Sequence, residues 1–330
     1  MSPWKPFVTF FTSLRLTVVL LVLSMVLVFW ATLAQVQLGV WGVQEKFFRT
    51  FFVLGYVPNT RIPVPLYPGG YFLGGLLLIN LIVSHVYRFR FTWAKAGIQL
   101  THAGLILLLV GELLTGLMQE EFQLRLGQGE TRNYSESFRL NEVAIIETTD
   151  PHYDDVVAIP EEIIAKGAPV QHPKLPFRVV PRFYLPNANL TMQSQLPAGT
   201  PTVPNTTTQG IGPRLAVIGL PITYRDNERN LPVAYLELIG NDGSLGTWLV
   251  SPMLVQAQTF DFAGRNWRIE FRFAREYKPF SLTLLELRHD IYPGSDIPKN
   301  FSSRVRITDA AGGNEREALI YMNNPLRYEG

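Results

Sequence analysis

The stretch from Tyr71 to Met118 decides the fold of this chain. It reads YFLGGLLLINLIVSHVY, then RFRFTWAK, then AGIQLTHAGLILLLVGELLTGLM. Each of its two apolar runs has about the length that a helix needs to cross roughly 30 Å of hydrocarbon. The short loop between them carries Arg88, Arg90 and Lys95. Because short basic loops stay in the cytoplasm, the sequence predicts two membrane spans joined on the cytoplasmic side.

A third apolar run, LRLTVVLLVLSMVLVFWATLA, precedes them at residues 14–34. Ala34 could serve as a cleavage position, but the run exceeds the apolar core of about 7–15 residues in a signal peptide. We therefore favour an uncleaved span. Lys5 and Arg15 place its amino end in the cytoplasm. The predicted membrane domain is thus residues 1–118, with spans near 14–34, 71–87 and 97–118, and residues 119–330 are expected to be extracytoplasmic.

Charge and composition exclude several classes of protein. Residues 1–118 carry a net charge of +6 and the remaining residues carry −4. The basic residues lie where membrane topology requires them, so no nucleic-acid partner is expected. The chain has no cysteine, so it forms no disulfide, performs no thiol exchange and cannot attach a haem to itself through C-x-x-C-H.

Residues 35–70 are rich in aromatic residues and proline. Phe47, Phe48, Phe51 and Phe52 recur at near-helical spacing, which predicts a short amphipathic helix on the membrane surface. A packed loop without a ligand is the alternative, and the prolines at 58, 63, 65 and 68 exclude a long helix.

The residue pattern of 119–330 predicts a β-rich domain. Short alternating or β-branched runs are separated by turn-type residues such as Asn241-Asp242-Gly243 and Gly312-Gly313-Asn314, which predicts a largely antiparallel domain. Residues 186–213 are predicted to be a long loop. The predicted class is an α+β membrane protein, with three N-terminal transmembrane helices followed by the β-domain. The predicted strands lie at residues 143–148, 177–185, 215–224, 233–240, 247–256, 267–273, 281–287, 303–309 and 317–322.

Two histidines inside the spans are candidates for function. His85 lies three residues before Arg88, and His102 lies seven residues after Lys95, so both lie on the cytoplasmic side, at depths within about 6 Å of each other. An imidazole is a good axial ligand for haem iron, although spacing alone favours hydrogen-bonded histidines. Glu112 lies about 15 Å from His102 along the helix axis, too far to share a small metal site. Asn80 is expected to hydrogen-bond another helix.

The other polar clusters predict no chemistry. His152, His172 and His289 lack metal-ligand spacing, and a solvated loop explains the acids at 150, 154 and 155 better than calcium binding. The sequence contains no P-loop, no G-x-S-x-G and no H-E-x-x-H.

Four segments in order resemble the ResB/CcsB family of system II cytochrome c biogenesis proteins. They are SLRLTVVLLVLSMVLVFWATLAQ, then GGYFLGGLLLINLIVSHVYRF with WAKAGIQLTHAGLILLLVGELLTG, then GLMQEEFQLRLGQGETRNYSES, and finally IYMNNPLRYEG. The family's fold implies a fourth membrane helix after the β-domain, so the chain as given is expected to be truncated or a shorter variant.

The resemblance implies a function in haem handling. It implies a non-catalytic subunit that works with a CcsA-type membrane protein to move b-type haem, as transient cargo, outward to apocytochrome c. His102 matches the family's haem-contacting position in the third span, whereas His85 does not clearly match. The implied setting is the bacterial cytoplasmic (inner) membrane and its lipid. The alternative is a membrane-anchored scaffold whose β-domain binds another envelope protein without contacting haem.

Overall fold

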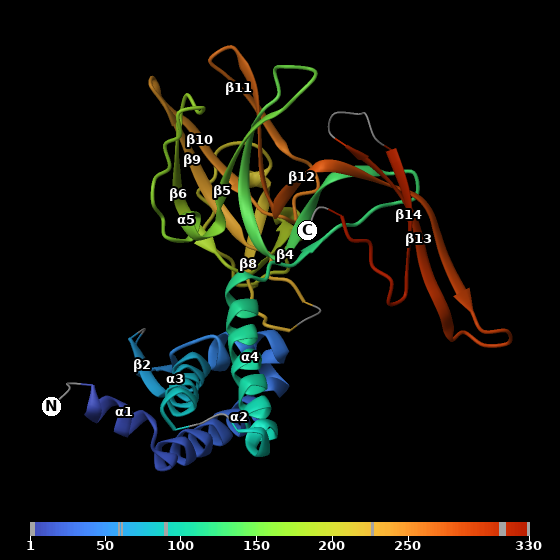
Figure 1. The fold of residues 1–330 in the computed structure, drawn as a ribbon. Coiled ribbons are helices and arrows are strands. Elements are labelled where there is room, and N and C mark those ends of the chain that lie inside the picture. The colour runs from blue at the N-terminus through green and yellow to red at the C-terminus, as the bar shows by residue number, and fades with distance from the viewer. Residues whose placement is uncertain are drawn as a thin grey trace. The chain divides into compact units, whose positions relative to one another are not determined.

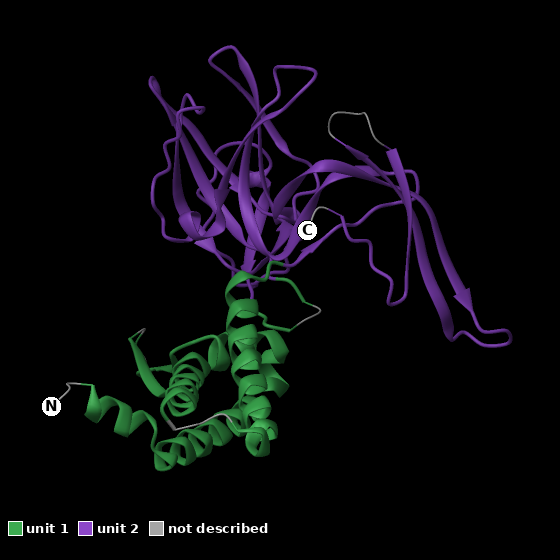
Figure 2. Cartoon of the chain, in the orientation of Figure 1, with its two compact units in different colours: residues 1–120, 223–229 green, residues 121–222, 230–330 purple. Residues whose placement is uncertain are grey.

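The computed structural model (Figure 1) describes residues 4–58, 60, 62–88, 92–225, 228–309 and 315–328, without the side chain of Arg88. Arg90 and the predicted turn at 312–314 lie outside the described residues. The chain divides into two compact units, shown in Figure 2. The helical unit comprises residues 1–120 and 223–229, and the β-unit comprises residues 121–222 and 230–330. Membrane-length helices followed by antiparallel strands confirm the predicted α+β class.

The helical unit contains three helices that are long and apolar enough to cross a membrane, within Leu14–Phe48, Gly70–Tyr87 and Trp93–Met118. Two of these ranges include a neighbouring short helical turn. A two-stranded hairpin connects the first and second helices. The elements in order are α1 (Lys5–Phe11), α2 (Leu14–Val43), the π-helical turn η1 (Gln44–Phe48), β1 (Phe52–Tyr56), β2 (Pro63–Pro68), α3 (Gly70–Arg88), η2 (Trp93–Lys95) and α4 (Ala96–Met118).

A kink at Gly39 redirects the end of α2. Gly39 has φ 70° and ψ 175°, a conformation that glycine adopts without the steric cost of a side chain. Beyond the kink, the chain brings the Phe47 ring edge-on to Trp30, with 5.2 Å between ring centroids. The predicted amphipathic helix is wrong beyond Phe48. From Phe52 the chain forms strand β1 instead, because Val53 is buried between two exposed neighbours and the alternation has a period of two.

Asn80 connects α3 to the start of the first span, as its position in the sequence predicted. Its side chain is buried, accepts a hydrogen bond from Thr17 Oγ1 at 2.7 Å, and donates from Nδ2 to the Phe11 carbonyl at 2.6 Å. The bond to Phe11 satisfies a carbonyl at the end of α1, where the helix offers no partner.

Replacing Asn80 with alanine is expected to destabilise the helical unit by about 1–3 kcal/mol, because the Phe11 carbonyl and the Thr17 hydroxyl lose their partner in a buried place. Thermal unfolding of the detergent-purified protein measures the loss. Thr17→Val removes one bond and is expected to cost less. Equal stability of the wild type and Asn80→Ala would show that the two bonds contribute nothing.

The β-unit contains a seven-stranded antiparallel sheet and a three-stranded sheet. In the larger sheet β14, β13, β12, β4 and β3 lie in this order, with β11 on β12 and β5 on β4; the smaller sheet has the order β10, β9, β6, and β7 pairs with β8. The strands are β3 (Phe122–Gln123), β4 (Thr131–Glu147), β5 (Asp155–Pro160), β6 (Arg178–Leu185), β7 (Ala188–Met192), β8 (Leu215–Gly219), β9 (Val233–Gly240), β10 (Gly243–Val250), β11 (Gln258–Phe262), β12 (Arg265–Ile291), β13 (Pro298–Asp309) and β14 (Glu315–Tyr321). The short helical segments are α5 (Glu161–Ala165), η3 (Gln193–Gln195) and η4 (Gly212–Arg214).

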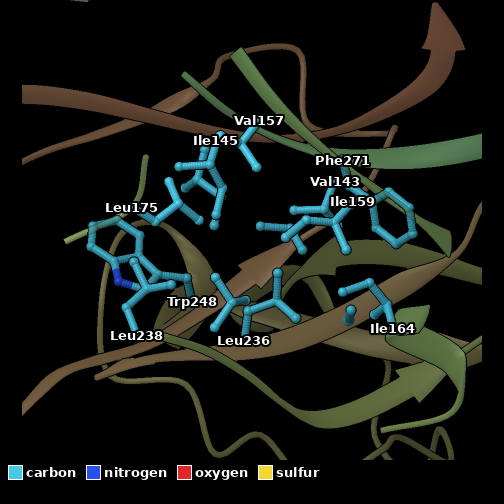
Figure 3. Packing of buried hydrophobic residues seen from close by; sticks show 14 of the residues in the cluster. Val143, Ile145, Val157, Ile159, Ile164, Leu175, Leu236, Leu238, Trp248 and Phe271 are labelled. Atoms are coloured by element: carbon cyan, nitrogen blue, oxygen red, sulfur yellow. The ribbon is translucent and has the colours of Figure 1, made fainter. Parts of the chain in front are cut away.

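The main core lies between the two sheets (Figure 3). Val143 and Ile145 of β4 and Ile269 of β12 meet Leu236 and Leu238 of β9, and all five are buried. Burying one such side chain contributes roughly 1.5–3 kcal/mol, so this layer of side chains stabilises the packing of one sheet on the other.

Two predictions about the β-unit need correction. Residues 186–213, predicted as a loop, contain β7 and two short 3₁₀ turns, and β7 is stabilised by pairing with β8, which sequence alone does not reveal. The strands predicted at 267–273 and 281–287 are one strand, β12. Pro279 does not end it, because the pairing with β4 skips from Tyr277 to Leu282 and proline is tolerated at such irregularities.

A buried ion pair joins β4 and β12. Arg272 Nε donates to Glu142 Oε1 at 2.9 Å, and the two side chains are 8% and 10% exposed. Arg272 Nη1 also lies 3.8 Å from Glu270 Oε2. The pair is therefore removed from solvent, although Arg272 lies between two apolar residues in the sequence.

Candidate functional site

The two membrane histidines lie close together on neighbouring helices. His85 of α3 and His102 of α4 are both half-buried, with 6.4 Å between their ring centroids and 39° between their ring planes. Each ring projects from a membrane-length helix. The sequence predicts similar depths for the two residues, and the structure shows that α3 and α4 bring their side chains together.

A backbone carbonyl orients the His102 ring. His102 Nδ1 lies 2.7 Å from the carbonyl oxygen of Ile98, one turn earlier on α4. Since a carbonyl can only accept, Nδ1 carries the proton of this bond. In the neutral imidazole the lone pair then lies on Nε2, and a bond from Nδ1–H to a carbonyl is a common support for a metal-binding histidine.

The donor set fits haem iron. Imidazole nitrogen is an axial ligand in many haem proteins. A ring nitrogen with a lone pair would supply this ligand, and the iron would accept the lone pair. His85 and His102, with 6.4 Å between their ring centroids, are the two side chains that would hold the iron.

Glu112 does not belong to this site. It is exposed on α4, about 15 Å along the helix axis from His102. In the part of the chain that the structure describes, no three side chains of His, Asp or Glu gather as a metal site.

The histidines of the β-unit have local contacts instead. The His289 ring stacks on Phe301 with 4.3 Å between centroids and 7° between planes. His172 Nδ1 accepts a hydrogen bond from the backbone N–H of Lys174. The backbone N–H of His152 donates to Asp150.

The remaining acids of the same loop form ion pairs. Asp154 lies 3.2 Å from Arg268, and Asp155 pairs with Lys174. These contacts, like those of the β-unit histidines, are structural and do not create a cation site.

The fold defines a class of protein: a membrane protein with three membrane-length helices followed by an antiparallel β-unit. A family model, the ResB-like family, matches residues 83–330. The chain therefore belongs to the ResB-like family, and the predicted resemblance is confirmed. A search of curated proteins finds no match.

Family membership indicates a role in cytochrome c biogenesis, in which ResB-like proteins are generally non-catalytic components, and it agrees with the association with a membrane. The matched range contains His85, His102 and the whole β-unit. It does not contain α1, α2 or the β1–β2 hairpin.

Proposed function

We propose that this chain is the membrane subunit of a system II cytochrome c biogenesis complex that helps move haem outward and presents it for attachment to apocytochrome c. The observation that carries the proposal is the orientation of His102. Its Nδ1 donates to Ile98, which leaves the lone pair of the neutral ring on Nε2. His85, 6.4 Å away between ring centroids, would supply a second ligand.

Haem is the cargo in this proposal, not a resident cofactor. A weakly enclosed site suits a transient ligand, because both imidazoles are half-buried and α4 leaves most of its surface open. When bound, the iron would accept the lone pairs of the imidazoles. The residues of this chain would hold and orient the haem, and they would form no bond to its vinyl groups, since the chain has no cysteine.

The partners follow from the same proposal. A CcsA-type membrane protein would share the haem path, and the β-unit would dock apocytochrome c or that partner. The protein would lie in the bacterial cytoplasmic membrane, with its N-terminus in the cytoplasm and residues 119–330 outside. The basic loop before Lys95 supports this orientation by the positive-inside rule.

An absorption spectrum of the complex tests the function. The chain is co-expressed with its CcsA-type partner and purified in detergent, as wild type and as His102→Ala. We expect a Soret band in the wild type and the loss of most of it in the variant, because the iron loses a nitrogen ligand. An unchanged Soret band in His102→Ala would assign the haem to the partner and leave this chain as a scaffold.

A further inference from the structure

The β1–β2 hairpin presents apolar side chains on the outside of the helical unit. Between residues 51 and 69 the sole charged residue is Arg61, which lies outside the described residues. The exposed large side chains are Phe51, Phe52, Leu54, Tyr56, Val57, Ile62 and Leu66. An exposed apolar surface of this kind marks contact with a partner or with lipid.

The hairpin packs against the part of α2 that contains Leu23 and Trp30. Tyr67 of β2 donates from its hydroxyl to the Leu23 carbonyl at 3.0 Å, and its ring lies edge-on to Trp30 at 6.3 Å between centroids. Leu23 is about 14 Å along the axis from Leu14, at a rise of 1.5 Å per residue. A layer of about 30 Å centred on the apolar run at 16–34 therefore contains both Leu23 and Trp30.

The two faces of the hairpin have different neighbours. Val53 is 4% exposed and packs into a cluster with Leu27, Phe47 and Leu73 of the helical unit. Leu54, its neighbour on β1, points away and is 53% exposed. Because successive side chains of a strand alternate between faces, one face covers the helices and the other is left to the surroundings.

The free edge of β2 is low in hydrogen-bond donors. Pro63, Pro65 and Pro68 lie opposite Tyr56, Leu54 and Phe52 in the ladder. Proline has no backbone N–H, so the hydrogen bonds between β1 and β2 use the N–H groups of other residues of β2. At these three positions the outer edge of β2 therefore has no N–H donor. An unpaired N–H is costly in hydrocarbon, and the prolines remove this cost where it would arise.

We propose that the β1–β2 hairpin is immersed in the membrane, in the leaflet that surrounds Trp30, with its exposed side chains against lipid acyl chains. At a similar depth on α2, Val26, Phe29 and Leu33 are also exposed. Its lack of charge among the described residues fits acyl chains better than a soluble protein partner.

Single-cysteine labelling tests the proposal, because the chain has no cysteine of its own. The full chain is prepared as Leu54→Cys and Leu66→Cys, labelled with an environment-sensitive nitrobenzoxadiazole dye, and reconstituted in phosphatidylcholine vesicles. Val255→Cys, at a fully exposed residue of the β-unit, is the control. Quenching is measured with brominated phosphatidylcholine and, separately, with aqueous iodide.

We expect brominated lipid to remove most of the emission at positions 54 and 66 and iodide to remove little, with the opposite result at 255. Two hairpin positions are used so that poor folding of one variant does not decide the result. Quenching of both hairpin positions by iodide alone would overturn the proposal and place the hairpin in water. Protection from both quenchers would also overturn it and show that another protein surface covers the hairpin.

Discussion

Replacing His102 with glycine is expected to lower the yield of mature c-type cytochrome to the level of cells without this chain, and added imidazole is expected to restore part of it. Glycine removes the nitrogen ligand and leaves a space in which free imidazole can bind the iron. The yield is measured as covalently bound haem in the membrane fraction, with and without imidazole in the medium. His102→Phe keeps a ring but supplies no lone pair, so it is expected to be inactive and not rescued.

The control for this experiment is Leu107→Gly on the same helix. Leu107 is 73% exposed, so this variant carries the same helix penalty of about 1 kcal/mol for glycine without removing a ligand. We expect it to keep near-normal yield. A normal yield from His102→Phe would contradict the ligand role and indicate that the ring serves packing.

Replacing His85 with alanine tests whether His85 binds the haem iron as a second ligand or only lies beside His102. If His85 and His102 both bind one iron, losing His85 leaves the iron with His102 alone. We expect haem to remain bound but its ferric spectrum to change from low-spin to high-spin. An unaltered spectrum would assign the second ligand to another subunit.

The membrane helices could be predicted because length and composition alone determine them. An apolar run such as LRLTVVLLVLSMVLVFWATLA is long enough to span hydrocarbon whatever its neighbours are. The bond from Asn80 to another helix could also be predicted, since a polar amide inside a span needs a partner. The kink at Gly39 could not be predicted from the sequence. Gly39 adopts a positive φ, whereas Gly42, three residues later in the same helix, does not, so the presence of a glycine does not reveal which one forms the kink.

The site was predictable in part. A short loop between two spans brings His85 and His102 to similar depths, but the rotation of each helix decides whether the rings face each other, and no local pattern fixes this rotation. The β-unit shows the same limit. β7 depends on pairing with β8, and β12 continues past Pro279 because residues 278–281 of β12 are left out of its pairing with β4. Such features depend on residues far apart in the sequence.

We expect the largest loss of stability in the β-unit when the Glu142–Arg272 ion pair is broken. Glu142→Ala is expected to lower the free energy of opening of β4 and β12 by about 3–5 kcal/mol, because it leaves a guanidinium buried without its nearest acceptor. After the substitution, Glu270 at 3.8 Å remains the nearest carboxylate that contacts Arg272 among the described residues. Hydrogen exchange of the backbone amides of the two strands, measured on the full chain in detergent, reports this free energy.

Two further variants distinguish the cost of leaving a charge buried and unpaired from the cost of losing the contact between the two side chains. Removing both charges, as Glu142→Leu with Arg272→Leu, is expected to restore most of the protection, since paired apolar side chains replace a buried ion pair at little cost. Glu317→Ala breaks a pair with Arg306 whose side chains are 50% and 40% exposed, and exposed pairs contribute less than about 1 kcal/mol. Equal exchange rates in Glu142→Ala and Glu317→Ala would contradict the prediction, because burial makes the first charge costly to leave unpaired.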